Sequence, residues 1–303
     1  MGNLSLKIKL VAITFFSLII LASVLASISV VNMESALKGE SNAKLTSARD
    51  SKIKQVETYF KNRVSDISIL SRNNDVVALT AFLDKQISEK ELEADEEYPT
   101  DSYSIQSETE KYQEFLQKYI EVYAYYDLYI ISEKEGYVMF SAAQESDNGQ
   151  NLSEGELKTS GLALAWRKAK ELKRPVFVDM KPYEPIADTP AMFLATPIYV
   201  NGTFKAVLAF QLSNSSINDI MKFKKGYGKS QEDYLVGSDF LMRSDSFFSK
   251  KTHTLEKSFE TPKTGNVKTK AVKDVFSNKK ENIEVIKNYK NKEVLSAYSS
   301  IKI

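Results

Sequence analysis

The sequence contains no cysteine and a single histidine, His253. The absence of cysteine excludes disulfide bonds, thiolate zinc sites, iron–sulfur clusters and thiol nucleophiles. A single histidine excludes a metal site built from several histidines, and any Ser-His-Asp triad would have to use His253. This residue lies in a polar stretch, where we expect an exposed loop. We therefore predict no catalytic residues, no metal ligands and no cofactor.

Neither sign of charge is in excess. The 303 residues include 41 Lys and Arg and 40 Asp and Glu, which gives a formal net charge of +1. Nucleic-acid-binding domains normally carry a clear basic excess, so we expect no nucleic-acid partner. At about 100–200 residues per domain, the length corresponds to roughly two domains.

Long hydrophobic runs are scarce too, and the sequence has one, from Leu10 to Val31. As a helix it would be about 33 Å long, enough for a hydrocarbon core of roughly 30 Å. Lys7 and Lys9 precede it, which places residues 1–9 in the cytoplasm and residues 32–303 outside, in the periplasm of a bacterium. A cleaved signal peptide is the alternative, but its apolar region is usually shorter, about 7–15 residues.

Helix breakers are rare in the region that follows. Between Gly39 and Gly136 there is no glycine, and Pro99 is the only proline. We expect a stalk helix over residues 32–85, continuous with the membrane helix, and a homodimer formed through it. The alternative is a helix that packs only on its own domain. The evidence is an apolar stripe at steps of three and four residues: Ile53, Val56, Phe60, Val64, Ile67 and Leu70.

The period changes to that of strands near Tyr126. Asn201-Gly202 is a strong signal for a tight hairpin between two such runs. Helical segments precede and separate the strands, which predicts an antiparallel sheet flanked by helices over residues 86–224, as in PAS-like sensor modules. The predicted strands are Tyr126–Ser132, Tyr137–Ser141, Pro175–Asp179, Ala191–Val200 and Phe204–Leu212.

The C-terminal stretch repeats part of this pattern. Asp233–Ser244 resembles Asp127–Ser132 with its turn and return strand, a weak internal repeat. Strands near Ile283–Tyr289 and Glu293–Ser300 follow. We therefore predict a second module over residues 225–303. The fold class is α+β: a transmembrane helix over residues 10–31, a long stalk helix and two tandem PAS-like modules with antiparallel sheets.

These features together resemble the double Cache ectodomain of bacterial transmembrane receptors. Phe177–Pro185 and Pro190–Ile198 look like late strands of the module distal to the membrane. Gly226–Asp245 looks like the opening of the proximal module, and Val294–Tyr298 looks like a strand near its end. The resemblance covers the chain from the membrane helix to the C-terminus.

The resemblance implies a sensor that binds a small molecule in the distal module and signals across the bacterial inner membrane. Such receptors continue through a second membrane helix into a cytoplasmic output. The output is most often a methyl-accepting chemotaxis domain, and histidine kinases and nucleotide cyclases are the alternatives. No second span precedes Ile303, so we expect a receptor truncated before it.

A ligand of this fold would lie between the distal sheet and its covering segments. Such sites are mostly apolar, with a few polar groups that fix the ligand. A carboxylate at Asp179 could pair with a ligand ammonium, and aromatic rings could form the walls. The alternative is that Asp179 caps a turn and the rings are core. The candidate residues are Tyr126, Asp127, Phe140, Asp179, Tyr183, Asp188 and Phe193.

The class of ligand remains open among amino acids, amines and carboxylates. Amino-acid-sensing members of the family carry an arginine closely followed by a Trp-Tyr pair. The only tryptophan here, Trp166, precedes Arg167 and adjoins no tyrosine, so we expect Trp166 to be core. A membrane-anchored hydrolase that uses paired carboxylates is a further alternative.

Overall fold

The computed structural model describes residues 5–93, 96–223, 228–277 and 281–303. The predicted boundary between the two modules, at residues 224 and 225, lies outside these ranges, and so do Gly226 and Tyr227 of the resemblance.

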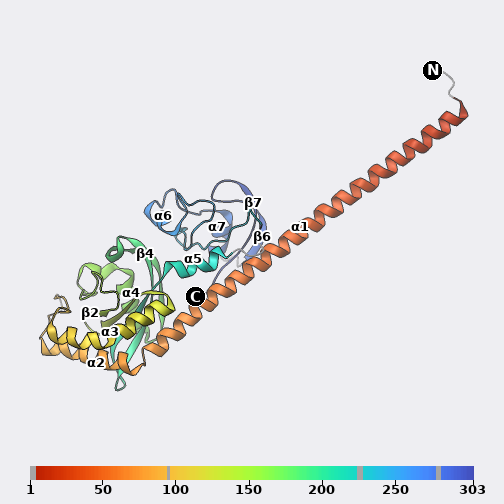
Figure 1. Cartoon of the computed structure of the whole chain (residues 1–303). Coiled ribbons are helices and arrows are strands. Elements are labelled where there is room, and N and C mark those ends of the chain that lie inside the picture. The colour runs from red at the N-terminus through yellow and green to blue at the C-terminus, as the bar shows by residue number, and fades with distance from the viewer. Residues whose placement is uncertain (1–4, 94–95, 224–227, 278–280) are drawn as a thin grey trace.

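Helix α1 (Leu6–Leu70) joins the apolar run and the stalk in one continuous helix of 65 residues. It extends far beyond the rest of the chain, and its apolar end projects away from all other elements (Figure 1). In the described part of the chain it is the one helix long and apolar enough to cross a membrane. Residues 32–44 are exposed, a bare helical segment of about 20 Å between the apolar run and the first packed residues.

The stalk ends at Leu70, earlier than the predicted residue 85. The side chain of Asn73 accepts hydrogen bonds from the amides of Asp75 (2.8 Å) and Val76 (3.4 Å) and so caps a new helix, α2 (Asn74–Glu89). An N-terminal Asn and an acidic first turn are standard helix-start signals. The break between α1 and α2 is therefore marked in the sequence by a capping asparagine and not by a glycine or a proline.

The main sheet has five antiparallel strands in the order β2-β1-β5-β4-β3. The predicted hairpin at Asn201-Gly202 is confirmed, and both residues have positive φ. The predicted α+β class is also confirmed. The strand bounds are β1 Tyr125–Ser132, β2 Val138–Ser141, β3 Val176–Tyr183, β4 Thr189–Val200 and β5 Thr203–Leu212.

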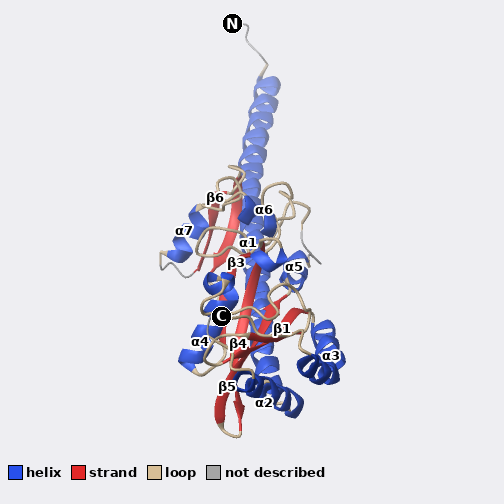
Figure 2. Ribbon diagram, turned by 90° about the vertical axis from the view of Figure 1, so that its left-hand side faces the viewer, coloured by secondary structure: helices blue, strands red, loops and turns tan. Residues whose placement is uncertain are grey.

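The two faces of this sheet are covered by different segments. Side chains of α1, α2 and α3 (Tyr103–Tyr123) pack on one face. Helix α4 (Gly161–Leu172), with the 3-10 turn Glu156–Thr159 before it, packs on the other. Figure 2 shows the strands between these helices. A second 3-10 turn, Glu184–Ile186, follows β3.

In the residues that the structure describes, the C-terminal region has fewer strands than the predicted second module. Where the repeat of Asp233–Ser244 predicted a hairpin, the structure has one isolated bridge, between Val236 and Met242. Its sheet has two strands. The elements are α5 Asn214–Lys222, which leads into the region, α6 Leu255–Glu260, α7 Lys270–Phe276, β6 Glu281–Lys287 and β7 Glu293–Ser299.

This region lies beside α1, between the five-stranded sheet and the apolar run (Figure 1). Arg49 of α1 donates to the carbonyl of Tyr298 on β7 (3.4 Å) and pairs with Glu281 (3.1 Å). Lys52 donates to the carbonyl of Phe223, just after α5 (2.8 Å). The stalk is thus attached by polar contacts to the elements at both ends of the C-terminal region.

Candidate ligand site

Polar side chains gather on the face of the sheet that α4 covers. Asp127 and Tyr129 are two residues apart on β1, so both point to this face. Gln211 pairs opposite Asp127, and Ser141 pairs opposite Tyr129. We call the set the acid–tyrosine cluster; each member is at most 2% exposed, and the members are Asp127, Tyr129, Ser141, Asp147, Tyr183, Phe193 and Gln211.

Asp127 is held by three donors. One carboxylate oxygen accepts from the amides of Leu128 (2.6 Å) and Ala143 (2.9 Å), and the other accepts from the hydroxyl of Ser141 (2.6 Å). These hydrogen bonds favour the ionised form, but burial disfavours it more strongly. Burial therefore raises the pKa of Asp127 to about 7.

Asp147 comes from the loop after β2 and contacts the sheet through Tyr183. The Tyr183 hydroxyl donates to its Oδ2 at 2.7 Å, whereas the buried Oδ1 has no hydrogen-bond partner. Burial raises the pKa of Asp147 as well, and the tyrosine hydroxyls around it partly oppose the shift. A buried acceptor without a donor is costly, so Oδ1 is an atom that a ligand donor could satisfy.

Aromatic rings surround the two acids. The ring of Tyr183 meets that of Phe193 edge-on at 5.0 Å, and Tyr129 lies 6.4 Å from Phe193. The Tyr129 hydroxyl donates to Gln211 Oε1 at 2.8 Å. Burial raises the pKa of Tyr129 and Tyr183, so both hydroxyls stay protonated and act as donors.

No cation balances this cluster among the residues that the structure describes. Neither Asp127 nor Asp147 forms an ion pair there, and the charges that act on them are carboxylates, which raise their pKa further. Buried charges in proteins are normally paired. Two unpaired buried acids with aromatic walls are therefore suited chemically to accept a cationic group, above all an ammonium with several N–H donors.

A polar cleft of about 180 Å³ adjoins the cluster at the edge of β2. Ser141, which donates to Asp127, lies in its wall, and so does Asn148, the neighbour of Asp147. The buried Oδ1 of Asn148 also lacks a hydrogen-bond partner. The cleft thus provides open space beside Ser141, which is hydrogen-bonded to Asp127, and beside Asn148, which follows Asp147 in the sequence.

Of the seven candidates from the sequence, the structure brings Asp127, Tyr183 and Phe193 together. Phe140 points to the opposite face of the sheet, because side chains alternate along β2; it packs with the core under α1 to α3 and also lines the 180 Å³ cleft. Tyr126 is 41% exposed and its hydroxyl donates to Glu145 at 2.7 Å.

The side chains of the two remaining candidates are not part of the cluster, although the amide of Asp188 donates to the carbonyl of Tyr183 at 3.1 Å. Asp188 is exposed in the turn after β3, with a φ of 58°. Asp179, which was expected to face a ligand ammonium, pairs with the protein's own Arg243 at 2.8 Å.

Sequence reasoning missed four members: Tyr129, Ser141, Asp147 and Gln211. Tyr129 could have been found from Asp127 by the two-residue alternation of a strand. Gln211 could have been noticed as the one polar side chain in the apolar run from Ala206 to Leu212. Asp147 lies in a loop, and no local pattern marks it.

Two other predictions from single residues had different outcomes. Trp166 is core, as predicted: it is 4% exposed, and its Nε1 donates to the carbonyl of Ser132 at 2.8 Å. The prediction that His253 is exposed is wrong, because it is 5% exposed and its ring lies against Tyr289 with centroids 4.3 Å apart. Burial lowers the pKa of His253.

Comparison with known proteins gives matches among solved structures. They include the sensor domain of the V. cholerae histidine kinase DctB, with 12% identity over 70% of each chain and a TM-score of 0.46. The ligand-binding domain of the Pseudomonas fluorescens chemoreceptor CtaA in complex with L-serine has 9% identity over 75% of this chain and 81% of the other, with a TM-score of 0.45.

A third similar structure is the ligand-binding domain of the Pseudomonas aeruginosa amino acid chemoreceptor PctC in complex with GABA. It has 10% identity over 76% of this chain and 88% of the other, with a TM-score of 0.43. No family model and no curated protein matches the chain.

Proposed function

We propose that the chain is the sensing region of a membrane-anchored bacterial receptor that binds a small cationic ligand at the acid–tyrosine cluster. The observation that carries this proposal is the pair Asp127 and Asp147, both 0% exposed and both without a cationic partner in the described residues. A ligand ammonium would supply the missing charge and a donor for Asp147 Oδ1. The ligand class is therefore amines, including amino acids.

The cationic group would be recognised by charge and by rings together. Tyr129, Tyr183 and Phe193 line the cluster, and a desolvated cation over such rings gains about 2 kcal/mol. Because each member of the cluster is buried, the ligand must enter by displacement of the loop after β2, beside the 180 Å³ cleft. Binding would thus change the position of that loop.

The anchoring follows from α1. In this proposal the run from Leu10 to Val31 spans the inner membrane, Lys7 and Lys9 stay in the cytoplasm and residues 32–303 lie in the periplasm. The bare segment 32–44 pairs with its copy in a homodimer. The signal goes to a cytoplasmic output for chemotaxis, or to a histidine kinase or nucleotide cyclase.

A thermal-shift screen of the full chain in detergent micelles tests the binding. Amines, amino acids and simple carboxylates are offered to the wild type and to Asp127→Asn. At 100 times Kd a ligand stabilises by about 2.7 kcal/mol. We expect hits among amines, stronger at pH 8 than at pH 5.5, because the carboxylate must be ionised to pair with the ammonium.

The matched control is Asp188→Asn, a substitution of the same kind at an exposed position of the same module. It should keep the wild-type shift, whereas Asp127→Asn should lose it. Hits confined to carboxylates, or hits that Asp127→Asn leaves unchanged, would contradict the proposed site.

A further inference from the structure

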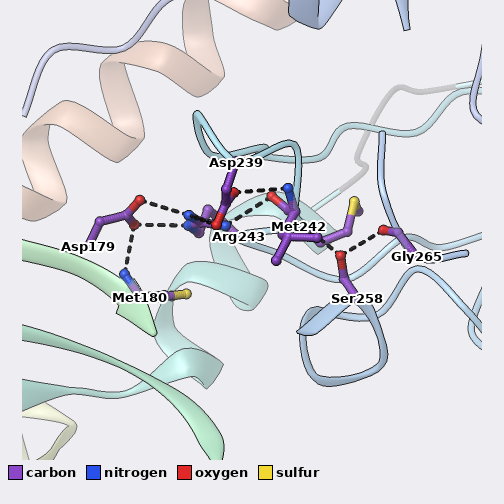
Figure 3. Close-up of polar contacts among 8 residues, drawn as sticks. Asp179, Met180, Asp239, Met242, Arg243, Ser258 and Gly265 are labelled. Carbon is purple, nitrogen blue, oxygen red and sulfur yellow. Dashed lines mark hydrogen bonds and ion pairs between the residues drawn. The ribbon is translucent and has the colours of Figure 1, made fainter. Parts of the chain in front are cut away.

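Arg243 of the C-terminal region forms a two-bonded ion pair with Asp179 on β3 (Figure 3). Its Nε donates to Asp179 Oδ1 at 2.9 Å and its Nη2 to Oδ2 at 2.8 Å. Such a fork fixes both the distance and the orientation of the two groups. The Arg243 side chain is 8% exposed, so the pair is shielded from water on the arginine side.

The guanidinium is held in place by its own region. Nη2 also donates to Asp239 (2.9 Å) and Nη1 to the carbonyl of Leu241 (3.0 Å), and the ring of Phe259 lies 5.1 Å away. The backbone of Gly237 packs against it so closely that a Cβ there would lie 2.2 Å from the guanidinium carbon. The Arg243 side chain is thus fixed in one conformation in which it contacts Asp179.

Asp179 lies at an irregular point of an edge strand. The register between β3 and β4 shifts between Val178 and Lys181, so Asp179 and Met180 form a bulge. Bulges interrupt the ladder and re-aim nearby side chains. Four residues further along the same strand, Tyr183 enters the acid–tyrosine cluster and donates to Asp147.

We infer that Arg243 is a positioning residue for the acid–tyrosine cluster. By holding the bulge at Asp179, it sets the position of β3 and hence the contact of Tyr183 with Asp147. The contact of Tyr183 with Asp147 joins the loop after β2 to β3, and the Asp179–Arg243 pair joins β3 to the C-terminal region. That region is attached to α1 through Arg49 and Lys52. The inference rests on the proposed function, since it gives the route by which occupancy of that site would reach the stalk.

Coupling of this kind is reciprocal. If loss of the Arg243–Asp179 pair makes opening of the loop after β2 easier, loss of the Tyr183–Asp147 contact must make opening of the segment around Arg243 easier by the same free energy. A purely local role for Arg243 would show no effect on the loop. This difference makes the inference testable without any ligand.

The experiment is hydrogen exchange by mass spectrometry on the full chain in detergent micelles. Two peptides report: residues 143–152, which include the Gly149 amide bonded to Val138, and residues 235–247, which include the Arg243 amide bonded to Leu235. Arg243→Gln should accelerate exchange in 143–152 by about fivefold or more, the lower end of typical coupling. Arg243→Lys, which keeps the charge without the fork, should lie between.

The reciprocal arm uses Tyr183→Phe, which removes one hydroxyl and leaves the ring. It should accelerate exchange in 235–247, whereas Tyr199→Phe, at an exposed position on β4, should not. If Arg243→Gln fails to fold, Asp179→Asn breaks the same pair at a half-exposed carboxylate, with Asp188→Asn as its control.

Faster exchange confined to the peptide that contains the substitution would overturn the inference. That result is independent of the amine screen, because a receptor can bind its ligand without this coupling, and the coupling can exist in a chain that binds no amine.

Discussion

The buried carboxylate of Asp127 makes folding less favourable at neutral pH, and its removal should therefore stabilise the protein. Burial raises its pKa from 3.8 to about 7. The folded state holds the proton over this range while the unfolded state has lost it, so the contribution of Asp127 to stability is greatest below pH 3.8 and falls as the pH rises towards 7. One pKa unit corresponds to about 1.4 kcal/mol, which gives a cost of about 4 kcal/mol above pH 7.

Asparagine at this position keeps the shape and cannot ionise. Its Oδ1 can accept from the amides of Leu128 and Ala143, and its Nδ2 can donate to the hydroxyl of Ser141, which now donates to Asp127. We therefore expect Asp127→Asn to unfold at a free energy about 2–4 kcal/mol higher than the wild type at pH 8. The difference should vanish near pH 4.

Urea unfolding of the full chain in micelles measures this difference, with the fluorescence of Trp166, the single tryptophan, as the probe. Asp147 has a raised pKa too, so only the difference between the two proteins at each pH is interpreted. Asp188→Asn should differ from the wild type by the same amount at every pH. A variant that is destabilised at pH 8, or whose difference does not change with pH, would refute the reasoning.

Two further predictions concern other buried groups. Burial lowers the pKa of His253. The folded state therefore binds fewer protons than the unfolded state below pH 6.5, and this residue makes stability fall as the pH drops. The thermal midpoint of His253→Gln should fall less between about pH 7 and pH 5 than that of the wild type. Gly136 has a φ of 75°, and a Cβ there would lie 2.9 Å from the Trp166 ring. Gly136→Ala should therefore lower the free energy of unfolding in urea by about 1–3 kcal/mol. Gly202→Ala should cost less, because Gly202 has a similar φ but open space around it.

Local patterns predicted the elements that depend on local chemistry. The apolar run and the Asn201-Gly202 turn are set by hydropathy and by positive φ, and the structure has both. The end of the stalk was missed because α1 ends at Leu70 and Asn73 caps the next helix without a glycine or proline. The breaker count is therefore a weaker signal than a capping side chain.

The predicted hairpin at Asp233–Ser244 forms only in part, as one antiparallel bridge between Val236 and Met242. Its sequence resembles the first hairpin, but the Arg243 side chain turns to Asp179, and the Ser244 hydroxyl accepts from the amide of Leu235. A strand forms where its side chains and edges find partners, and the partner of the Arg243 side chain lies on β3. The pattern alone does not contain this information.

The candidate site shows the same limit. Asp179 was expected to pair with a ligand ammonium, whereas in the structure it pairs with Arg243, which is 64 residues away in the sequence. Asp147 reaches Tyr183 across 36 residues from a loop without a motif. Residues on strands could be predicted as members of a site, whereas the loop that completes it depends on the tertiary fold.

The carboxylates of Asp127, Asp147 and Asp179 differ in one respect that matters for function. Asp179 has its cation within the protein, and that pair joins two regions of the chain. Asp127 and Asp147 have no such partner in the described residues, so their charge raises the free energy of the folded state at neutral pH. A ligand cation would relieve this cost, and the stabilisation that it gives would be largest where both acids are ionised. Gain of stability and loss of amine binding in the same Asp127→Asn protein would therefore separate a binding site from a packing defect, because a defect predicts only the gain.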